Sequence, residues 1–441
     1  MRFNRGLVPL LVAILVLAGC SQSLYLRGRS LCDDGQHRQA VTTLQAGLQS
    51  DAADYRSWCE LGVAHFELGE YELALTAQKR SLALQPTARA QLYVGMCYEK
   101  LAPGESTPEA KASRYALARE AYRASLGLNP PQALLRGIQA RMERLLRIEE
   151  IQKALFKENT IDADTIPANT VAVYDFDSEG LPPELAPLAV GLAEFTSLSL
   201  TKVKSLQVVE RLRVQELLRE MEWVKEGKVD ASMAPRTGLL LGSSRVVTGW
   251  VSNPEAEKVR LGSSIHNTAD HSEATPDIEE GKLQRIITLQ VAFVYQILKE
   301  LGVEPTPAER EAIEALPTES YDAFLSFCRG LQFKAEGNYK EAQQQFEAAI
   351  AADEGFTEAA VQSEETASLE AGDNLEVDIM VATVETPDLG ATLGGLVENT
   401  GAAEPSADDD DGGGGGVTDD PPPPPEIPKG SVIVEGTFDG N

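Results

Sequence analysis

A repeated spacing of glycines constrains the fold of this chain more than any other feature of the sequence. Gly28, Gly62 and Gly95 recur at intervals of about thirty-four residues, and small and aromatic residues follow each of them at matching positions. The clearest copy covers residues 55–88 and contains Trp58, Leu61, Gly62, Phe66, Gly69, Tyr71, Ala74, Ser81 and Pro86. Small residues at these positions let two helices cross closely, and a proline ends the second helix. The spacing therefore predicts stacked helical hairpins, one for each repeat.

Two weaker copies flank the clearest one, at residues 21–54 and from about residue 88 onward. Together the copies resemble the tetratricopeptide repeat (TPR) family, so we place TPR repeats at residues 20–131. The resemblance implies a concave groove that binds a peptide or a protein partner. The candidate groove residues are first-helix side chains that we expect to be exposed, namely Tyr55, Arg56, Glu60 and His65.

One further copy lies far along the chain, at residues 323–356, within a predicted TPR-like helical hairpin at 305–361. A single repeat cannot bury its apolar face alone, so it must pack on the central domain or on the first array. Between the array and the central domain, residues 132–165 are predicted to form a capping or connecting helix. Its apolar side chains recur every three or four residues at Leu135, Ile138, Met142, Leu145 and Ile148.

Strands alternate with helices from residue 166 to residue 304, which predicts an α/β domain with a mixed sheet and a late hairpin at 245–266. Three stretches carry a resemblance over residues 170–301: VAVYDF at 171–176, VVER at 208–211 and LLLGSSRVVTGWV at 239–251. They resemble the CsgG-type curli-secretion lipoproteins, which are close in fold to the amino-terminal domain of TolB and to the penicillin-binding-protein activator lipoproteins. The predicted fold class is therefore multidomain, with α-helical repeats and an α/β domain.

The curli-secretion family implies a pore built from two long hairpins inserted in this domain. Membrane strands need about 9 to 11 residues each, with apolar and polar side chains alternating. Here the candidate hairpin at 245–266 is expected to have short strands, and VRLGSSIH offers no apolar stripe toward lipid. We therefore expect a member that does not form a pore.

The N-terminus has the layout of a secretory signal peptide, with Arg2 and Arg5 before an apolar run from Leu7 to Leu17. The run is too short to span a bilayer, and it ends in Leu-Ala-Gly-Cys. This ending resembles the bacterial lipobox, which implies a signal peptide at residues 1–19 and lipidation of Cys20. A plain signal peptide is the alternative. In the family, Ser21 after the cysteine implies the outer membrane, with the protein facing the periplasm.

Residues that could carry chemistry are few. The net charge of −29 argues against nucleic acid as a partner. The other cysteines have no C-x-x-C spacing and are expected to be packing residues: Cys32, Cys59, Cys97 and Cys328. Asp175 and Asp177 are expected at a solvated strand end, and Glu210–Arg211 as a local ion pair or helix cap. We expect no catalytic residue, no metal site and no cofactor.

The C-terminal part, residues 362–441, is predicted to be an acidic, Gly- and Pro-rich disordered tail. It contains nineteen acidic residues and one lysine, together with the run DDDDGGGGG. Two short stretches within it, NLEVDIMVATVE and SVIVEGTF, have high β-propensity.

These features together predict a lipid-anchored periplasmic scaffold that mediates protein–protein interactions in the bacterial cell envelope. The partners would be envelope proteins or peptides, and self-association of the central domain is left open. Two alternatives remain at this stage: a subunit of a secretion channel of the curli type, and an activator of a peptidoglycan synthase.

Overall fold

The computed structural model describes residues 22–178, 180–221, 224–225, 228–229, 231–255 and 257–385. The predicted signal peptide, Cys20 and residues 386–441 of the predicted tail lie outside these residues. Within the described ranges, none of the helices has the length and apolar character needed to cross a membrane.

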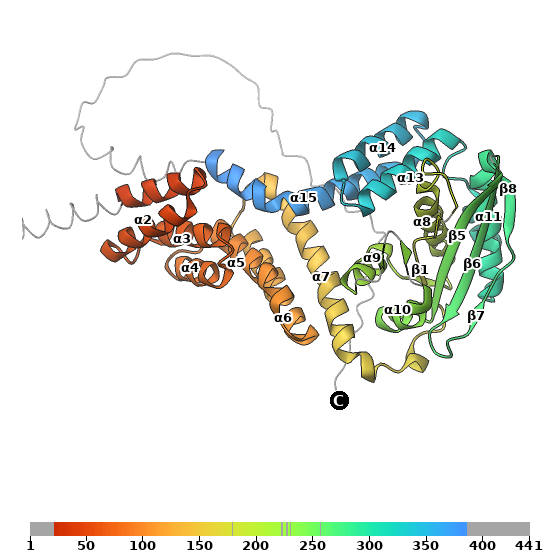
Figure 1. Ribbon diagram of the computed structural model, residues 1–441, viewed down its shortest axis with the longest axis horizontal. Coiled ribbons are helices and arrows are strands. Elements are labelled where there is room, and N and C mark those ends of the chain that lie inside the picture. The colour runs from red at the N-terminus through yellow and green to blue at the C-terminus, as the bar shows by residue number, and fades with distance from the viewer. Residues whose placement is uncertain are drawn as a thin grey trace, which may run out of the picture. The chain divides into compact units, whose positions relative to one another are not determined.

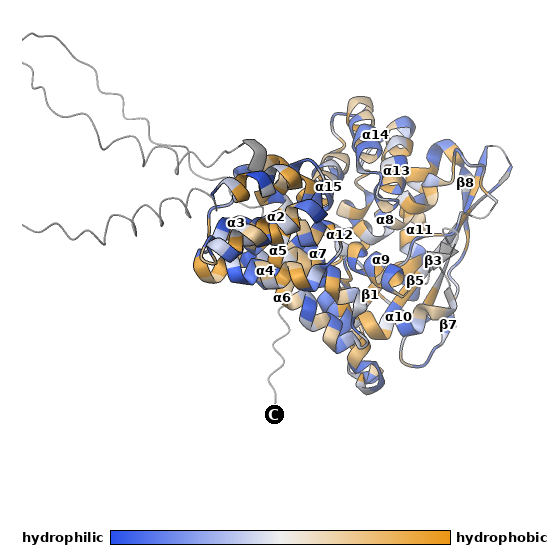
Figure 2. Ribbon diagram, turned by 60° about the vertical axis from the view of Figure 1, so that its left-hand side comes forward, coloured by the Kyte–Doolittle hydropathy of each residue, from blue (hydrophilic) through white to orange (hydrophobic). Residues whose placement is uncertain are grey.

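Paired helices form an N-terminal array in which each helix packs against the next (Figure 1). A first helix at residues 22–33 is followed by α2 (His37–Ser50), α3 (Tyr55–Glu67), α4 (Tyr71–Leu84), α5 (Ala88–Leu101) and α6 (Pro108–Leu126). Asp54 and Thr87 begin α3 and α5, because their side-chain oxygens accept hydrogen bonds from backbone N–H groups of the first turn. In Figure 2 the labelled array helices carry hydrophilic and hydrophobic residues in alternation, as expected of helices with one buried face.

A glycine in the first helix of each repeat makes room for a side chain of the second helix. A Cβ at Gly62 would lie 2.5 Å from Gln78 Nε2, and a Cβ at Gly28 would lie equally close to Leu44. Further pairs make the same close approach: Gly95–Tyr122 and Gly330–Phe346. The glycine spacing in the sequence therefore reflects the space needed between two crossing helices.

Replacing Gly62 with valine is expected to lower the free energy of unfolding by about 1–3 kcal/mol, because the added side chain displaces Gln78. Gln78 Nε2 would then lose its 2.9 Å hydrogen bond to the Cys59 carbonyl oxygen. Urea unfolding followed by circular dichroism measures the change. The control is Gly127→Ala, since a Cβ at Gly127 meets nothing closer than 3.5 Å. Equal unfolding midpoints for the two variants would contradict the close-approach argument.

Helix α7 (Leu135–Lys157) belongs to two packing clusters at once. Its first part contributes Ile138 and Leu145 to the apolar cluster of the array. Its last part contributes Ile151 to a cluster with Ala172 and Leu217 of the α/β domain. The sequence left two alternatives for this segment, a cap on the array or a connector to the α/β domain. Helix α7 therefore does both.

The α/β domain contains a mixed sheet of six strands in the order β2-β1-β5-β6-β7, with β8 also paired to β6. Strands β2 (Gln207–Val208), β1 (Thr170–Val173) and β5 (Arg245–Glu255) are parallel. Strands β6 (Lys258–Asn267), β7 (Glu273–Ala274) and β8 (Glu279–Lys282) pair antiparallel. A separate small hairpin joins β3 (Val224–Lys225) to β4 (Lys228–Val229). The predicted mixed sheet is confirmed.

Helices cover both faces of the sheet (Figure 1). On one face, α8 (Pro187–Thr201) and α11 (Ile286–Glu300) share a cluster with Val171 and Val173 of β1. On the other, α9 (Arg211–Glu220) and α10 (Ala234–Leu241) share a cluster with Ala172 and Tyr174. Successive β1 side chains thus enter opposite layers, because strand side chains alternate. The remaining short helical turns are η1 (Ala102–Gly104), η2 (Gln132–Leu134), η3 (Glu158–Thr160), η4 (Ala163–Thr165), η5 (Ala231–Met233) and η6 (Leu283–Arg285).

The hairpin β5–β6 is longer than the sequence predicts. Its strands have 11 and 10 residues, so the expectation of short strands is wrong. Ser263 and Gly262, within the polar run of β6, are buried. Val251, Val259 and Leu261 of the hairpin lie in the cluster that also holds α8 and α11.

The isolated repeat consists of α13 (Tyr321–Ala335) and α14 (Tyr339–Ala352), preceded by α12 (Pro307–Glu314). Phe327 of α13 lies 5.1 Å, centroid to centroid, from Phe195 of α8 and 5.0 Å from Phe356. Of the two packing partners that the sequence allows, the structure therefore uses the central domain.

Residues 362–385 differ from the prediction, which places the disordered tail from residue 362. The chain continues as one helix, α15 (Thr357–Glu385), and the stretch with high β-propensity at 374–385 is helical. α15 packs on α14 and on α7. Its buried positions are spaced in a helical pattern but include few large apolar side chains: Ala359, Gln362, Thr366, Gly372, Leu375 and Ile379. Because few of these buried side chains are large and apolar, the sequence of residues 362–385 resembles that of a solvated tail.

Candidate functional site

The predicted groove residues at the start of α3 are half-buried. Arg56 Nε donates a hydrogen bond to Asp54 Oδ1 at 3.1 Å, and its guanidinium lies 4.9 Å from the centroid of the Tyr25 ring. The Tyr55 carbonyl oxygen accepts a 2.8 Å hydrogen bond from Ser81 of α4.

Two other predicted groove residues are buried, so the expectation of exposure is wrong for Glu60 and His65. Glu60 is only 2% exposed and forms an ion pair with Arg89 of α5. His65 is 7% exposed, and its Nδ1 lies 2.5 Å from Glu70 Oε2. Helix α3 packs against α2, α4 and α5, so most of its surface, including both of these side chains, is buried.

The four described cysteines are free and buried, as predicted for packing residues. Burial raises the pKa of the Cys59 thiol to about 11, and those of Cys32 and Cys97 to about 12. The thiolate is the reactive form, so these side chains remain protonated and unreactive near neutral pH.

A surface that the sequence did not indicate lies where α15 meets the array. Leu375 and Ile379 of α15 are fully buried, in the same apolar cluster as Phe66 of α3, Met96 of α5 and Ile138 of α7. We call the surface formed by Phe66, Met96, Lys100, Ile138 and Arg141 the helix-binding face. Phe66 is a repeat position that also packs on Tyr71 of α4 and Tyr93 of α5, whereas its cluster with α15, far along the sequence, is not marked by the repeat pattern.

Polar contacts frame the helix-binding face. Arg141 Nε donates a 2.7 Å hydrogen bond to the carbonyl oxygen of Gly372 in α15, and its Nη1 lies 2.6 Å from Glu99 Oε1. Tyr122 donates to the other oxygen of Glu99 at 3.0 Å. Lys100 Nζ lies 3.4 Å from Glu376 Oε2. A continuous polar chain thus joins α6, α5, α7 and α15.

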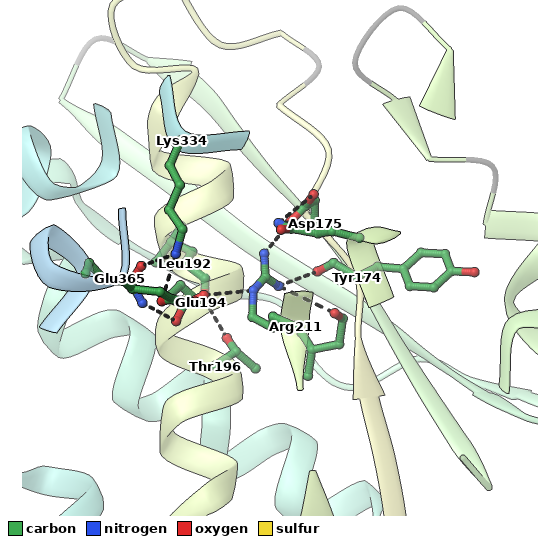
Figure 3. Close-up of polar contacts among 11 residues, drawn as sticks. Tyr174, Asp175, Leu192, Glu194, Thr196, Arg211, Lys334 and Glu365 are labelled. Atoms are coloured by element: carbon green, nitrogen blue, oxygen red, sulfur yellow. Dashed lines mark hydrogen bonds and ion pairs between the residues drawn. The ribbon is translucent and has the colours of Figure 1, made fainter. Parts of the chain in front are cut away.

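A cleft of about 500 Å³ lies where α7, α8, α9, α13 and α15 meet. Arg211, the first residue of α9, lies beside this cleft with its side chain only 8% exposed (Figure 3). It forms ion pairs with Asp175, just after β1, and with Glu194 of α8 at 2.9 Å. It also lies 3.4 Å from the carbonyl oxygens of Val173 and Tyr174.

The polar network continues from Glu194 to the C-terminal helices (Figure 3). Gln362 of α15 donates to Glu194 at 3.3 Å and accepts a 2.7 Å hydrogen bond from Lys334 of α13. Lys334 also pairs with Glu365 at 2.8 Å. The network therefore ties the α/β domain to the isolated repeat and to α15.

This network corrects two expectations from the sequence. Asp175 is paired with Arg211 and is not simply a solvated strand end. Arg211 pairs with Asp175 and Glu194 from other elements, while its neighbour Glu210 lies 3.8 Å from Arg147 of α7. The partners come from segments distant in the sequence, which adjacent-residue reasoning misses.

The polar side chains that line the cleft hold the surrounding helices together. Three cations that line the cleft have little-exposed side chains, Arg141, Arg211 and Lys334, and each is paired with at least one carboxylate, so these charges are already neutralised within the fold. In the part of the chain that the structure describes, no three His, Cys, Asp or Glu side chains come together as metal ligands would.

Comparison with known families assigns the two main parts of the chain. Residues 25–101 match the tetratricopeptide repeat family, and residues 162–265 match the family described as curli production assembly/transport component CsgG. The chain combines tetratricopeptide repeats with a CsgG-like domain. The resemblances to the tetratricopeptide repeat and to the CsgG family are confirmed, and we refer to the two parts as the TPR array and the CsgG-like domain.

A curated relative resembles a short part of the chain. Human (Homo sapiens) superkiller complex protein 3 is 39% identical over 70 residues, which are 16% of this chain and 4% of that protein. The chain therefore spans a small part of the length of this curated relative.

Solved structures of helical-repeat proteins also match at low identity. The Yersinia enterocolitica type III secretion chaperone SycD, in complex with a peptide of the translocator YopD, matches at 18% identity with a TM-score of 0.25, over 30% of this chain and 93% of that chain. A tetratricopeptide repeat protein from Parabacteroides merdae matches at 12% identity with a TM-score of 0.26, over 79% of this chain and 99% of that chain. Yeast Tom70 matches at 13% identity with a TM-score of 0.26, over 83% of this chain and 70% of that chain.

Proposed function

We propose that this protein is a lipid-anchored scaffold of the bacterial cell envelope that faces the periplasm and is not an enzyme. In this proposal the TPR array binds an envelope protein or peptide, and the CsgG-like domain docks a second partner or a second copy of the chain. The observation that carries the proposal is the helix-binding face, where Leu375 and Ile379 of a helix from another part of the chain are buried in one apolar cluster with side chains of the TPR array and α7. A surface with this geometry is suited to recognising helical segments.

Partner binding through the array is testable in cells by site-specific photo-crosslinking. A benzoylphenylalanine at Tyr55, the first residue of α3, is expected to capture a specific envelope protein. The same group at Leu117, which is 45% exposed on α6, serves as the control. If Tyr55 and Leu117 capture the same proteins, or if neither captures any, the scaffold function is excluded.

Lipid anchoring rests on the lipobox-like ending at Cys20, which lies outside the described residues. A Cys20→Ala variant is expected to lose incorporation of radiolabelled palmitate and to leave the membrane fraction, because acyl chains supply the membrane affinity of such anchors. A Cys59→Ala variant is the control, since Cys59 is buried in the array. Equal labelling of the wild type and the Cys20 variant would rule out the anchor.

A secretion-channel subunit is the alternative function, and the length of the hairpin β5–β6 favours it. Against it, Val251, Val259, Leu261 and Ile265 of this hairpin lie in the cluster with α8 and α11. Conductance of the purified protein in planar lipid bilayers would support the channel and replace the scaffold proposal.

A further inference from the structure

Helix α15 occupies the helix-binding face of the TPR array with features that a ligand would have. Residues 357–385 contain eight acidic residues and no lysine or arginine. The opposite side of the contact is basic, with Lys100 on α5 and Arg136, Arg141 and Arg144 on α7. The two surfaces are therefore complementary in charge.

Three kinds of contact define what this face accepts. Leu375 and Ile379, four residues apart, fill the apolar part of the face and are fully buried. Glu376 pairs with Lys100, and Asp373 Oδ1 lies 3.4 Å from Arg144 Nη1. The Gly372 carbonyl oxygen accepts the hydrogen bond from Arg141 Nε.

Close helix crossing adds a requirement for small residues. A Cβ at Gly137 of α7 would lie 2.5 Å from the Ala371 carbonyl oxygen, and a Cβ at Gly372 would lie 3.1 Å from Ala140 Cβ. The backbones of α7 and α15 approach closely only because these positions are small. Together these contacts define the motif Ala-Gly-Asp-x-Leu-Glu-x-x-Ile, which corresponds to residues 371–379. The letter x marks the three positions to which none of these contacts is assigned.

The outer side of the same helix differs from its inner side. Val377 and Val381 are 54% and 52% exposed, although Leu375 and Ile379 beside them are fully buried. Docking therefore depends on a narrow stripe of α15. Because α15 belongs to the same chain, it competes with any other ligand at an effective concentration on the order of millimolar.

We infer that the helix-binding face is a recognition site for an acidic amphipathic helix of a partner protein, and that α15 is its built-in competitor. This inference rests on the proposed function and names the partner class. The partner helix carries two apolar side chains four residues apart, a small pair before them and carboxylates facing Lys100 and Arg144. Binding in trans requires the C-terminal half of α15 to leave the face.

The test uses the full chain and a fluorescein-labelled synthetic peptide of residues 369–385. An Ile379→Asp chain is expected to bind this peptide at least about tenfold more tightly than the wild type. The new carboxylate cannot be buried unpaired, so the internal helix vacates the face and raises the fraction competent to bind. The matched control is Val377→Asp on the exposed side of α15, which is expected to bind as the wild type does. Fluorescence anisotropy gives both affinities.

A charge exchange tests the register of binding. Adding Lys100→Glu to the Ile379→Asp chain is expected to weaken peptide binding about fivefold, which is the upper range for a partly exposed ion pair. A peptide carrying Glu376→Lys is expected to recover the loss. The inference is overturned if Lys100→Glu leaves the peptide affinity unchanged. It is also overturned if the Ile379→Asp chain has a native circular dichroism spectrum but binds no peptide.

A second measurement guards against a variant that fails to fold. Excess peptide added to the wild-type chain is expected to speed hydrogen exchange at the amides of residues 373–382, because the peptide displaces them. Unchanged exchange at saturating peptide would show that α15 is a permanent part of the array. That outcome would leave the Tyr55 crosslinks to an envelope partner unaffected, so it separates failure of this inference from failure of the scaffold function.

Discussion

An Arg211→Met variant is expected to lose about 3–5 kcal/mol of unfolding free energy in the CsgG-like domain, because removing one member of a buried ion pair leaves its partners uncompensated. Arg211 is 8% exposed, and Glu194 and Asp175 face it from α8 and from the end of β1. The variant leaves two carboxylates without their shared cation. Urea unfolding monitored by tryptophan fluorescence, together with hydrogen exchange of β1 and α8, measures the loss.

The control for Arg211 is Arg236→Met. Arg236 pairs with Glu158, but its side chain is 42% exposed, so the expected loss is within about 1 kcal/mol. A double variant, Arg211→Met with Glu194→Met, is expected to recover part of the loss since one uncompensated charge is removed. If Arg211→Met costs no more than Arg236→Met, the network in Figure 3 does not hold the domain together.

A Phe327→Ala variant is expected to lose about 3–5 kcal/mol and to loosen the isolated repeat from the CsgG-like domain. Phe327 is fully buried, and its ring lies among those of Phe195, Phe346 and Phe356 at centroid distances of 5.1, 5.6 and 5.0 Å. Removing the ring leaves a cavity between α8 and α13. Limited proteolysis is expected to cut within residues 315–356 at lower protease concentrations than in the wild type.

The control for Phe327 is Phe156→Ala, which removes an equal volume from a ring that is 52% exposed. Its unfolding free energy is expected to stay within about 0.5 kcal/mol of the wild type. Indistinguishable proteolysis of the two variants would mean that the aromatic cluster does not attach the repeat.

The repeats and the mixed sheet could be predicted because their signals are local. The glycine that admits Gln78 lies in the same repeat as Gln78, so one helical hairpin contains the whole pattern. The strand at 170–173 has the sequence TVAV, with a β-branched or apolar side chain at each of its four buried positions, because both faces of a parallel strand are covered. Short-range periodicity is enough to recognise such elements.

The candidate site was predictable only in part. Tyr55 and Arg56 lie half-buried at the start of α3, whereas Glu60 and His65 are buried. The exposure of a side chain on the first helix of a repeat depends on what packs beside that helix. Glu60 is covered by Arg89 of the next repeat, with which it forms an ion pair. The helix-binding face depends on still more distant contacts, since Arg141 and Gly372 are 231 residues apart in the chain.

By itself the sequence determined the order of helical pairs, the α/β domain between them and the mixed character of its sheet, because each follows from side-chain periodicity within one segment. Only the tertiary structure decided three other features: that the isolated repeat packs on α8, that Arg211 joins Asp175 and Glu194, and that α15 lies on the TPR array. Each of these depends on shape and charge matching between distant segments, which no single stretch of residues encodes.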